Sequence, residues 1–328
     1  MKDVYGRSID YLRISLTDRC NFRCRYCMPE EGVDMLSHRD ILTFEEILAI
    51  VSVAVKRGIS KVRLTGGEPL VRKGVAGLIR DLKSIDGINS ISMTTNGFLL
   101  GEMAEELKER GLDRVNISLD TVNREKFLNI TRRDGLDKVI SGIDAAVKAG
   151  LNPVKLNSVI MRGTNDDEIL NLVRFAQEKK VILRFIEQMP FGSYSREDFV
   201  SAEEIKGIIT GEYGSPVKPD GDESALFAGF GPSEHSRFGE DGPVIGFITP
   251  VSNHFCGRCN RLRLTADGKL KPCLLSNEEI DLKSALRSGL SERDLESILT
   301  YAVDRKPKGH FLDSDIFEST RGMSKIGG

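Results

Sequence analysis

The chain reads YLRISLTDRCNFRCRYC over residues 11–27, where a β-rich run is followed directly by three closely spaced cysteines. The run YLRISL (11–16) predicts a strand, and Cys20, Cys24 and Cys27 lie in the loop after it. Thiolates are good ligands for iron–sulfur clusters and for zinc. Folds of the α/β class gather functional groups at the carboxyl ends of parallel strands. The stretch therefore predicts an α/β fold with a metal centre beyond its first strand.

Short β-rich runs continue to alternate with amphipathic helical patterns through the first half of the chain. Thr43 and Glu46 form a T-x-x-E capping box ahead of one such pattern, and Gly58 follows its last turn. Repeated strand–helix units predict parallel strands joined by right-handed crossovers. The further strand candidates are KVRLT (61–65), SISMTT (90–95), RVNISL (114–119), VKLNSVI (154–160) and VILRFIE (181–187). The other helical patterns lie at about 75–84, 99–110, 137–149 and 166–179.

Six strand–helix units could form most of a barrel or an open sheet. Polar motifs lie at or directly after the ends of the strands. In a barrel the carboxyl ends of all the strands meet at one opening, whereas in an open sheet such motifs would concentrate at a switch point. We therefore predict a partial (βα)6 TIM-like barrel over residues 1–210. The motifs are TGGEP (65–69), TTNG (94–97), SLD (118–120) and EQMP (187–190).

The remainder, residues 211–328, is predicted to be a C-terminal extension with a second metal site. Residues 211–243 are rich in glycine, proline and acidic residues, which predicts loops or short irregular strands. The apolar run PVIGFITPV (243–251) then leads into a second group of three cysteines. These are Cys256, Cys259 and Cys273.

Composition limits the classes of partner. The 328 residues are 40% hydrophobic and 29% charged, which is typical of a globular chain. A net charge of −2 gives no global attraction to nucleic acid. No apolar run approaches the roughly 18–20 residues that span a bilayer, and the start MKDVYGRSIDYLRISL lacks an apolar signal segment. We therefore expect a cytoplasmic protein without nucleic-acid or membrane partners, whose clustered cysteines are metal ligands or catalytic thiols.

Each cysteine trio allows two interpretations. Structural zinc normally has a closed shell of four ligands, which His38 could complete at the first trio and His254 at the second. A cluster with three thiolates instead keeps one iron open for a small molecule. Tyr26 could pack over such a molecule, and the consecutive glycines of TGGEP (65–69) would let backbone groups approach it. These features favour a cluster at the first trio.

Cations on the predicted strands and beside the second trio indicate a phosphate site. Guanidinium groups bind phosphates in bidentate fashion, and Arg261 and Arg263 share one face if their segment is a strand. Each cation alone would be read as a solvated surface charge, but the group together favours a triphosphate pocket. The other members are Arg13, Arg63 and Lys155.

The motifs also carry a family resemblance. CxxxCxxC with an aromatic residue before the last cysteine, followed by GGEP, resembles the signature of the radical SAM (S-adenosylmethionine) superfamily. From DYLRISLTDRCNFRCRYCMP to the terminal IGG, the chain is similar to the GTP 3′,8-cyclase family (molybdenum cofactor biosynthesis protein A). Its most specific stretch is SNHFCGRCNRLRLTADGKLKPCL (252–274).

This resemblance implies an activity and its cofactors. They are two [4Fe–4S] clusters, one on each trio, and SAM, whose cleavage yields a 5′-deoxyadenosyl radical. The implied reaction cyclises GTP to (8S)-3′,8-cyclo-7,8-dihydro-GTP, the first step of molybdenum cofactor (molybdopterin) biosynthesis. The implied partners are a flavodoxin-like or ferredoxin-like reductant and the cyclic pyranopterin monophosphate synthase that receives the product. A homodimer is compatible with the resemblance.

The resemblance also assigns roles to residues. The tail glycines Gly327 and Gly328 would reach into the active site and act there with Arg13, whereas local propensity alone predicts a frayed tail. The SAM pocket would be lined by Tyr26, Gly67, Ser118 and Met189. GTP would be held by Arg13, Arg63, Thr94, Lys155, Arg261, Leu262 and Arg263.

Two rival functions remain at this stage. A peptide-modifying radical SAM maturase also has auxiliary clusters, but typically carries more cysteines in a longer C-terminal region. A zinc-stabilised binding protein would have no catalytic activity and would be colourless after anaerobic purification.

Overall fold

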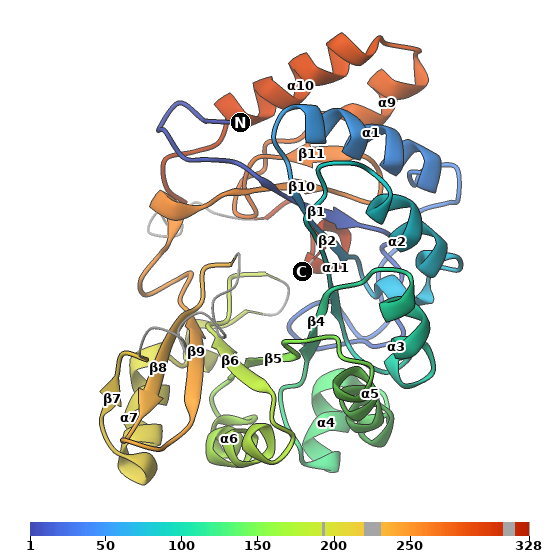
Figure 1. The fold of residues 1–328 in the computed structure, drawn as a ribbon. Helices are drawn as coiled ribbons and strands as arrows, with labels where there is room; N and C mark the ends of the chain where they lie inside the picture. The colour runs from blue at the N-terminus through green and yellow to red at the C-terminus, as the bar shows by residue number, and fades with distance from the viewer. Residues whose placement is uncertain (192–193, 220–230, 311–318, 328) are drawn as a thin grey trace.

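The computed structural model describes residues 1–191, 194–219, 231–310 and 319–327 (Figure 1). Its centre is a parallel sheet in which six strands pair in the order of the sequence, as a (βα)6 barrel requires. The six predicted strands are confirmed. They are β1 (Tyr11–Ser15), β2 (Lys61–Thr65), β3 (Ser90–Thr95), β4 (Arg114–Ser118), β5 (Lys155–Val159) and β6 (Ile182–Ile186).

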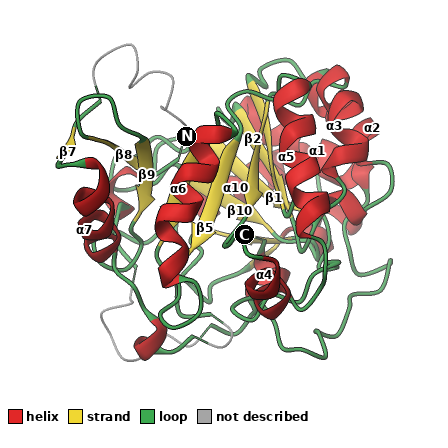
Figure 2. Cartoon of the chain, turned by 90° about the horizontal axis from the view of Figure 1, so that it is seen from below, coloured by secondary structure: helices red, strands yellow, loops and turns green. Residues whose placement is uncertain are grey.

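Helices cover the outer face of these strands (Figures 1 and 2). The capping box of Thr43 and Glu46 is present at the start of α1, whose apolar side is buried against the sheet. Two helices of this layer, α4 and α7, were not among the predicted patterns. The helices of this layer are α1 (Phe44–Lys56), α2 (Val75–Lys83), α3 (Leu100–Glu109), α4 (Arg124–Thr131), α5 (Leu136–Lys148), α6 (Ile169–Glu178) and α7 (Ala202–Tyr213). Short 3-10 turns lie at η1 (Pro69–Val71), η2 (Asp166–Glu168) and η3 (Arg196–Asp198).

The C-terminal extension lengthens the same sheet at both edges. At one edge β9 (Val244–Ile248) pairs in parallel with β6, and β8 (Glu234–Phe238) and β7 (Pro216–Val217) follow it. At the other edge β10 (Arg261–Leu264) pairs in parallel with β1. The resulting order is β12-β11-β10-β1-β2-β3-β4-β5-β6-β9-β8-β7. The division at residue 210 stays a prediction, and α7 runs across that point.

The remaining elements of the extension lie beyond β10. The strands β11 and β12 continue that edge antiparallel, and α10 packs against α1 (Figure 1). The predicted irregular region 211–243 contains the short strands β7 and β8, and its residues 220–230 lie outside the described chain. These elements are η4 (Cys256–Arg258), β11 (Lys269–Lys271), β12 (Ile280–Asp281), α9 (Leu282–Arg287), α10 (Glu292–Asp304) and α11 (Met323–Ile326).

None of the helices in the described ranges combines the length and the apolar composition needed to cross a membrane.

Candidate active site

The first cysteine trio lies in the loop that leaves β1. The three thiols are half-buried and none forms a disulfide. The sulfur of Cys20 accepts hydrogen bonds from the backbone N–H of Phe22 (3.4 Å) and from Asn96 Nδ2 (3.8 Å). Burial raises the pKa of Cys20 to about 11 and that of Cys27 to about 12, and the neighbouring thiols add to the shift at Cys24 and Cys27. Three thiolates gathered in one half-buried loop need a cation among them, as a metal centre provides.

Aromatic and charged side chains fix the shape of this loop. Phe22 packs edge-on against Phe98 and Phe127, with ring centroids 5.7 Å apart in both pairs. Tyr26 donates a hydrogen bond of 2.8 Å from its phenol to Asp120, which follows β4. Burial raises the pKa of Asp120 to about 6. The loop is therefore joined to the segment that follows the carboxyl end of β4.

The TGGEP turn packs directly against the backbone of the cysteine loop. A Cβ atom on Gly66 would lie 2.7 Å from Thr17 O, and one on Gly67 would lie 2.4 Å from Arg19 O, so both positions require glycine. Glu68 is buried and accepts hydrogen bonds from Thr95 Oγ1 and the Asn96 N–H, both at 2.7 Å. The sequence predicts that the backbone of this motif comes close to a bound molecule. The close approach that the structure shows is to the backbone of the cysteine loop.

One large cavity opens at the carboxyl ends of the strands and encloses about 280 Å³. Among the described residues, eight cationic side chains line it against one carboxylate, that of Asp120. The cavity therefore suits a polyanion. The cations are Arg13, Arg63, Arg114, Lys155, Arg184, Arg261, Arg263 and Lys306.

The sheet register brings three of these arginines together. Arg13 on β1 lies opposite Arg63 on β2 and opposite Arg263 on β10, so their side chains share the inner face of three adjacent strands. Burial and the neighbouring guanidinium groups lower the pKa of Arg13, and burial lowers that of Arg263 to about 10. Like charges held this closely in a buried place favour a bound anion.

A second group of cations faces them across the cavity. Burial, followed by the charge of Arg184, lowers the pKa of Lys155 to about 7. Arg184 donates a 2.6 Å hydrogen bond to Asn157 Oδ1, and burial lowers its own pKa to about 9. The buried polar atoms Thr94 Oγ1 and Asn116 Oδ1 and Nδ2 have no hydrogen-bond partner among the described residues. Unsatisfied buried polar atoms beside a cationic cavity indicate a polar ligand.

The second cysteine trio borders the same cavity. Cys256 begins η4, Cys259 follows it, and Cys273 comes after β11. Burial would raise the pKa of Cys259, but the charges of Arg261 and Lys306 outweigh it and lower the value to about 6. Burial raises the pKa of Cys256, and the thiols of Cys273 and Cys259 add to that shift. The three sulfurs are thus close enough to influence one another.

Lys306 connects the two segments that carry this trio. Its side chain is buried, and Nζ donates to Arg261 O (2.8 Å) and to Pro272 O (2.9 Å). These carbonyl groups lie two residues after Cys259 and directly before Cys273. Lys306 therefore holds the second and third cysteines of the trio in place.

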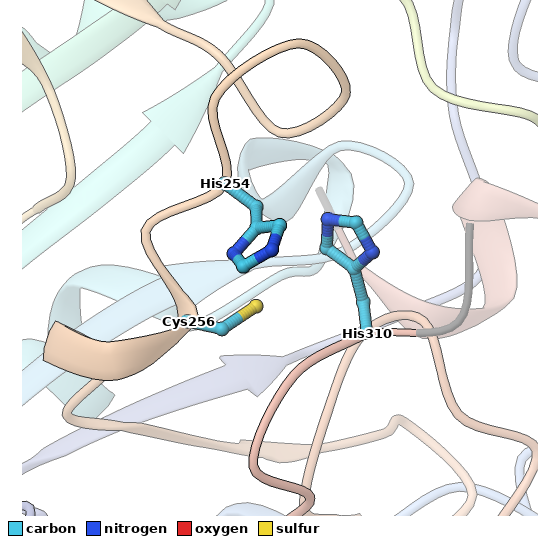
Figure 3. Close-up of side chains that lie close together, drawn as sticks. All are labelled: His254, Cys256 and His310. Atoms are coloured by element: carbon cyan, nitrogen blue, oxygen red, sulfur yellow. The ribbon is translucent and has the colours of Figure 1, made fainter. Parts of the chain in front are cut away.

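The spacing of the ligand atoms bears on the choice between zinc and a cluster. Within the described ranges, only His254, Cys256 and His310 form a group of three ligands close enough to hold a single ion (Figure 3). Neither cysteine trio by itself meets that condition, and His38 is exposed and joins no such group. Wider spacing suits a polynuclear cluster better than one zinc ion.

The tail reaches the centre of the site. Ile326 is buried with Phe191 and Leu275 in a small apolar cluster beside Met189 and Cys273. The backbone N–H of Ser324 donates to the Cys27 thiol. In Figure 1 α11 lies beside the central strands of the sheet. The frayed tail expected from propensity alone is therefore wrong, because α11 is anchored on both cysteine trios. Gly328 lies outside the described residues.

The predicted site residues divide into three groups. Gly67, Gly327 and the first trio are not among the residues that line the cavity; the trio is Cys20, Cys24 and Cys27. The side chain of Leu262 is fully buried in the core, because alternate residues of β10 face opposite sides of the sheet. Sequence reasoning missed Arg114, Arg184 and Lys306. The predicted residues that line the cavity are Arg13, Tyr26, Arg63, Thr94, Ser118, Lys155, Met189, Cys256, Cys259, Arg261, Arg263 and Cys273.

Comparison with known proteins gives matches to both halves of the chain. The model of the radical SAM superfamily matches residues 14–176, and that of Molybdenum Cofactor Synthesis C matches residues 181–312. The GTP 3′,8-cyclase of Moorella thermoacetica is 52% identical over 330 residues, and that of Thermodesulfovibrio yellowstonii is 47% identical over 331 residues. Both alignments cover 100% of this chain and 100% of the relative.

Solved structures give the same fold at low identity. Streptococcus suis SuiB bound to S-adenosylmethionine superposes with a TM-score of 0.60 at 14% identity, covering 97% of this chain and 77% of SuiB. The anSMEcpe structure with bound AdoMet gives 0.58 at 15% identity, covering 91% of this chain and 81% of that one. These likenesses confirm the fold alone.

Proposed function

This chain belongs to the GTP 3′,8-cyclase family of the radical SAM superfamily, and from that premise we propose that its cavity binds GTP and SAM beside two [4Fe–4S] clusters and cyclises the GTP. The product is (8S)-3′,8-cyclo-7,8-dihydro-GTP, in the first step of molybdenum cofactor biosynthesis. The observation that carries the proposal is a cavity that the described part of the chain lines with eight cations and one carboxylate, bordered by the second trio and by Tyr26 of the first loop.

The two trios fit the two clusters. Cys20, Cys24 and Cys27 would hold the first, and Cys256, Cys259 and Cys273 would hold the second. The fit is supported by mutually close thiols whose spacing in each trio exceeds that of a single-ion site. When bound, the first cluster and SAM supply a 5′-deoxyadenosyl radical by reductive cleavage of the sulfonium.

The end of the cavity nearest the first trio is the proposed SAM pocket. Tyr26, Ser118 and Met189 line it, and the phenol of Tyr26 is held by Asp120. Gly67 serves by letting the TGGEP turn pack against the backbone of the cysteine loop. These residues position the cofactor and exclude water from it.

The cationic part of the cavity is the proposed GTP site. Arg13, Arg63 and Arg263 on one wall and Lys155 and Arg184 on the other would neutralise the triphosphate. The remaining members of the site would be Thr94, Arg261 and the backbone of Leu262, with Asn116 as an added polar contact. Fixing the phosphates orients the ribose toward the SAM pocket, which is catalysis by proximity.

Arg13 and the two tail glycines are the proposed catalytic group. Arg13 lies between Arg63 and Arg263 in the register of the sheet. The carbonyl oxygen of Gly327 accepts a hydrogen bond from Arg263 and so orients that guanidinium. Gly328 would extend this contact toward the substrate.

Partners and compartment complete the proposal. SAM cleavage consumes an electron that no side chain of this chain supplies, so we expect a flavodoxin-like or ferredoxin-like protein to deliver it. The cyclised product would pass to cyclic pyranopterin monophosphate synthase. We place the protein in the cytoplasm because its thiols and clusters need reducing surroundings, and a homodimer is compatible with the proposal.

Anaerobic incubation with SAM, dithionite and each nucleoside triphosphate in turn tests the function. GTP, and not ATP, CTP or UTP, should yield a cyclised product that mass analysis detects together with 5′-deoxyadenosine. The purified protein should be brown and contain about eight iron atoms with matching sulfide. A colourless zinc protein, or a product from a peptide substrate instead of GTP, would refute the assignment.

A further inference from the structure

A compact group of three metal-ligating side chains lies at one corner of the second trio. His254 and Cys256 come from the segment between β9 and β10, and His310 comes from the segment after α10. One ligand atom of each lies within 4.8 Å of the other two. Figure 3 shows the two imidazole rings and the thiol gathered around one point. Zinc–ligand distances are about 2.0–2.3 Å, so an approach of roughly 1 Å lets these atoms share one ion.

His310 is fixed to the segment that carries the other two ligands. Its ring nitrogen Nε2 lies 2.7 Å from Pro250 O, and because a carbonyl only accepts, Nε2 donates that hydrogen bond. Its backbone N–H donates to the Cys256 thiol. The rings of His254 and His310 meet edge-on at 72°, with centroids 4.8 Å apart. Ligands oriented by backbone hydrogen bonds are typical of metal sites in proteins.

Arg7 makes a further connection between the segment that carries Cys256 and the segment that carries His310. Its Nη1 donates to Cys256 O (2.7 Å) and to Lys308 O (3.3 Å), and its Nη2 donates to Pro307 O (2.8 Å). The guanidinium is itself buried and paired with Asp3 at 2.5 Å. The segments that present Cys256 and His310 are therefore held together by a buried ion pair, independently of any cofactor.

We propose that His254, Cys256 and His310 bind a single Zn²⁺ ion when the second cluster is absent. Zinc accepts exactly such a mixed set of imidazole and thiolate ligands. Three protein ligands leave one coordination position, and all three ligand residues line the cavity. The chain would then have two alternative metal states at one corner.

The two states exclude each other, and this consequence rests on the proposed role of Cys256 in the second cluster. A zinc ion bound to Cys256 would compete with the cluster iron for the same thiolate. Zinc bound here would therefore block assembly of the second cluster while leaving the first trio untouched. Because His254, Cys256 and His310 all line the GTP cavity, such a chain would retain SAM cleavage without converting GTP.

Cobalt binding to the full chain tests the site itself. Cys20, Cys24, Cys27, Cys259 and Cys273 are replaced by alanine, so that Cys256 is the remaining cysteine, and circular dichroism checks the fold. We expect one Co²⁺ per chain with a thiolate-to-cobalt charge-transfer band, which His254→Ala/His310→Ala abolishes. The matched control His38→Ala, at an exposed histidine, should keep the band. A folded chain that binds no Co²⁺, or a band that survives loss of both histidines, overturns the proposal.

Since five substitutions could prevent folding, a second experiment uses the native cysteines. The apo chain is loaded with one equivalent of Zn²⁺ and then reconstituted with iron and sulfide. Iron content should fall about twofold, from about eight to about four atoms per chain, and His254→Ala/His310→Ala should restore it. Iron content that zinc does not change, or that the double variant fails to restore, overturns the exclusion. Neither readout requires GTP turnover, so failure here is distinguishable from failure of the proposed function.

Discussion

Arg263 donates a 2.5 Å hydrogen bond from Nη1 to the carbonyl oxygen of Gly327, which joins a cavity cation to the penultimate residue of the chain. Gly327 has a φ of 88°, and a Cβ atom there would lie 2.6 Å from Thr65 Oγ1. The tail thus occupies a space closed by the carboxyl ends of β1 and β2, in a conformation that glycine adopts most readily.

Appending one alanine after Gly328 should impair cyclisation while leaving the iron content unchanged, because the added residue would have to enter this closed space. Product formation by mass analysis and iron content by chemical assay check the result. Gly327→Ala should act in the same direction. Gly163→Ala is the matched control, since Gly163 also has a positive φ of 65° but has nothing within 4 Å of an added Cβ. Normal activity of the extended chain would show that the tail is dispensable.

Cys24→Ala should abolish SAM cleavage. The substitution removes one of three thiolates that the first loop offers, and an iron–sulfur cluster loses stability with each missing ligand. The measurement is 5′-deoxyadenosine formed under dithionite. Formation at the parental rate would disprove the assignment of this trio to the first cluster.

Cys259→Ala should separate the two halves of the reaction. Iron should fall by about four atoms per chain, SAM cleavage without product should persist, and GTP conversion should be lost. Comparing 5′-deoxyadenosine with cyclised product in one assay measures this uncoupling. Unchanged GTP turnover would contradict the role of the second trio.

Lys306→Met should lower the occupancy of the second cluster alone. The change removes hydrogen bonds to the Arg261 and Pro272 carbonyl groups and leaves the buried Pro272 carbonyl without that donor, at a cost of about 1–3 kcal/mol. Iron counts and the electron paramagnetic resonance signals of the two clusters report the loss. Lys306→Arg, which keeps the charge, should recover part of it. A methionine variant with full iron and both signals would sink the prediction.

Binding of GTP should take up a proton at Lys155. Its pKa of about 7 in the ligand-free cavity means that the amine is mostly neutral at pH 8, and a bound triphosphate favours the charged form. Affinity should therefore fall as pH rises above 7. Calorimetry at pH 8 in two buffers of different ionisation enthalpy measures the uptake, which Lys155→Met should lose. Equal uptake by the variant would place the proton elsewhere.

The strands, their order and the position of the metal loops could be predicted because each rests on local pattern. Six β-rich runs alternate with helical patterns, and parallel strands present their polar ends at one edge. The same two-residue period that placed Arg261 and Arg263 on one face also placed the side chain of Leu262 on the other. That consequence was available from the sequence.

The rest depended on contacts between distant residues. Arg184 is a single cation in an apolar strand pattern, and nothing local distinguishes it from a surface charge. Lys306 follows a helix near the end of the chain and gives no sequence signal of its contact with the second trio. The attachment of β9 and β10 to opposite edges was hidden for the same reason, because short strands carry little information about their partners.

Consecutive strands at opposite edges have a mechanical consequence. β9 pairs with β6 and β10 pairs with β1, so residues 249–260 cross the open side of the barrel between two anchored ends. Surface loops usually tolerate changes of length, but a tether of fixed span does not. Deleting a residue from this segment would pull the two edges together and narrow the entrance for substrate, whereas an insertion would slacken it. The length of residues 249–260, which carry His254, Cys256 and Cys259, therefore also sets the width of the open side of the barrel.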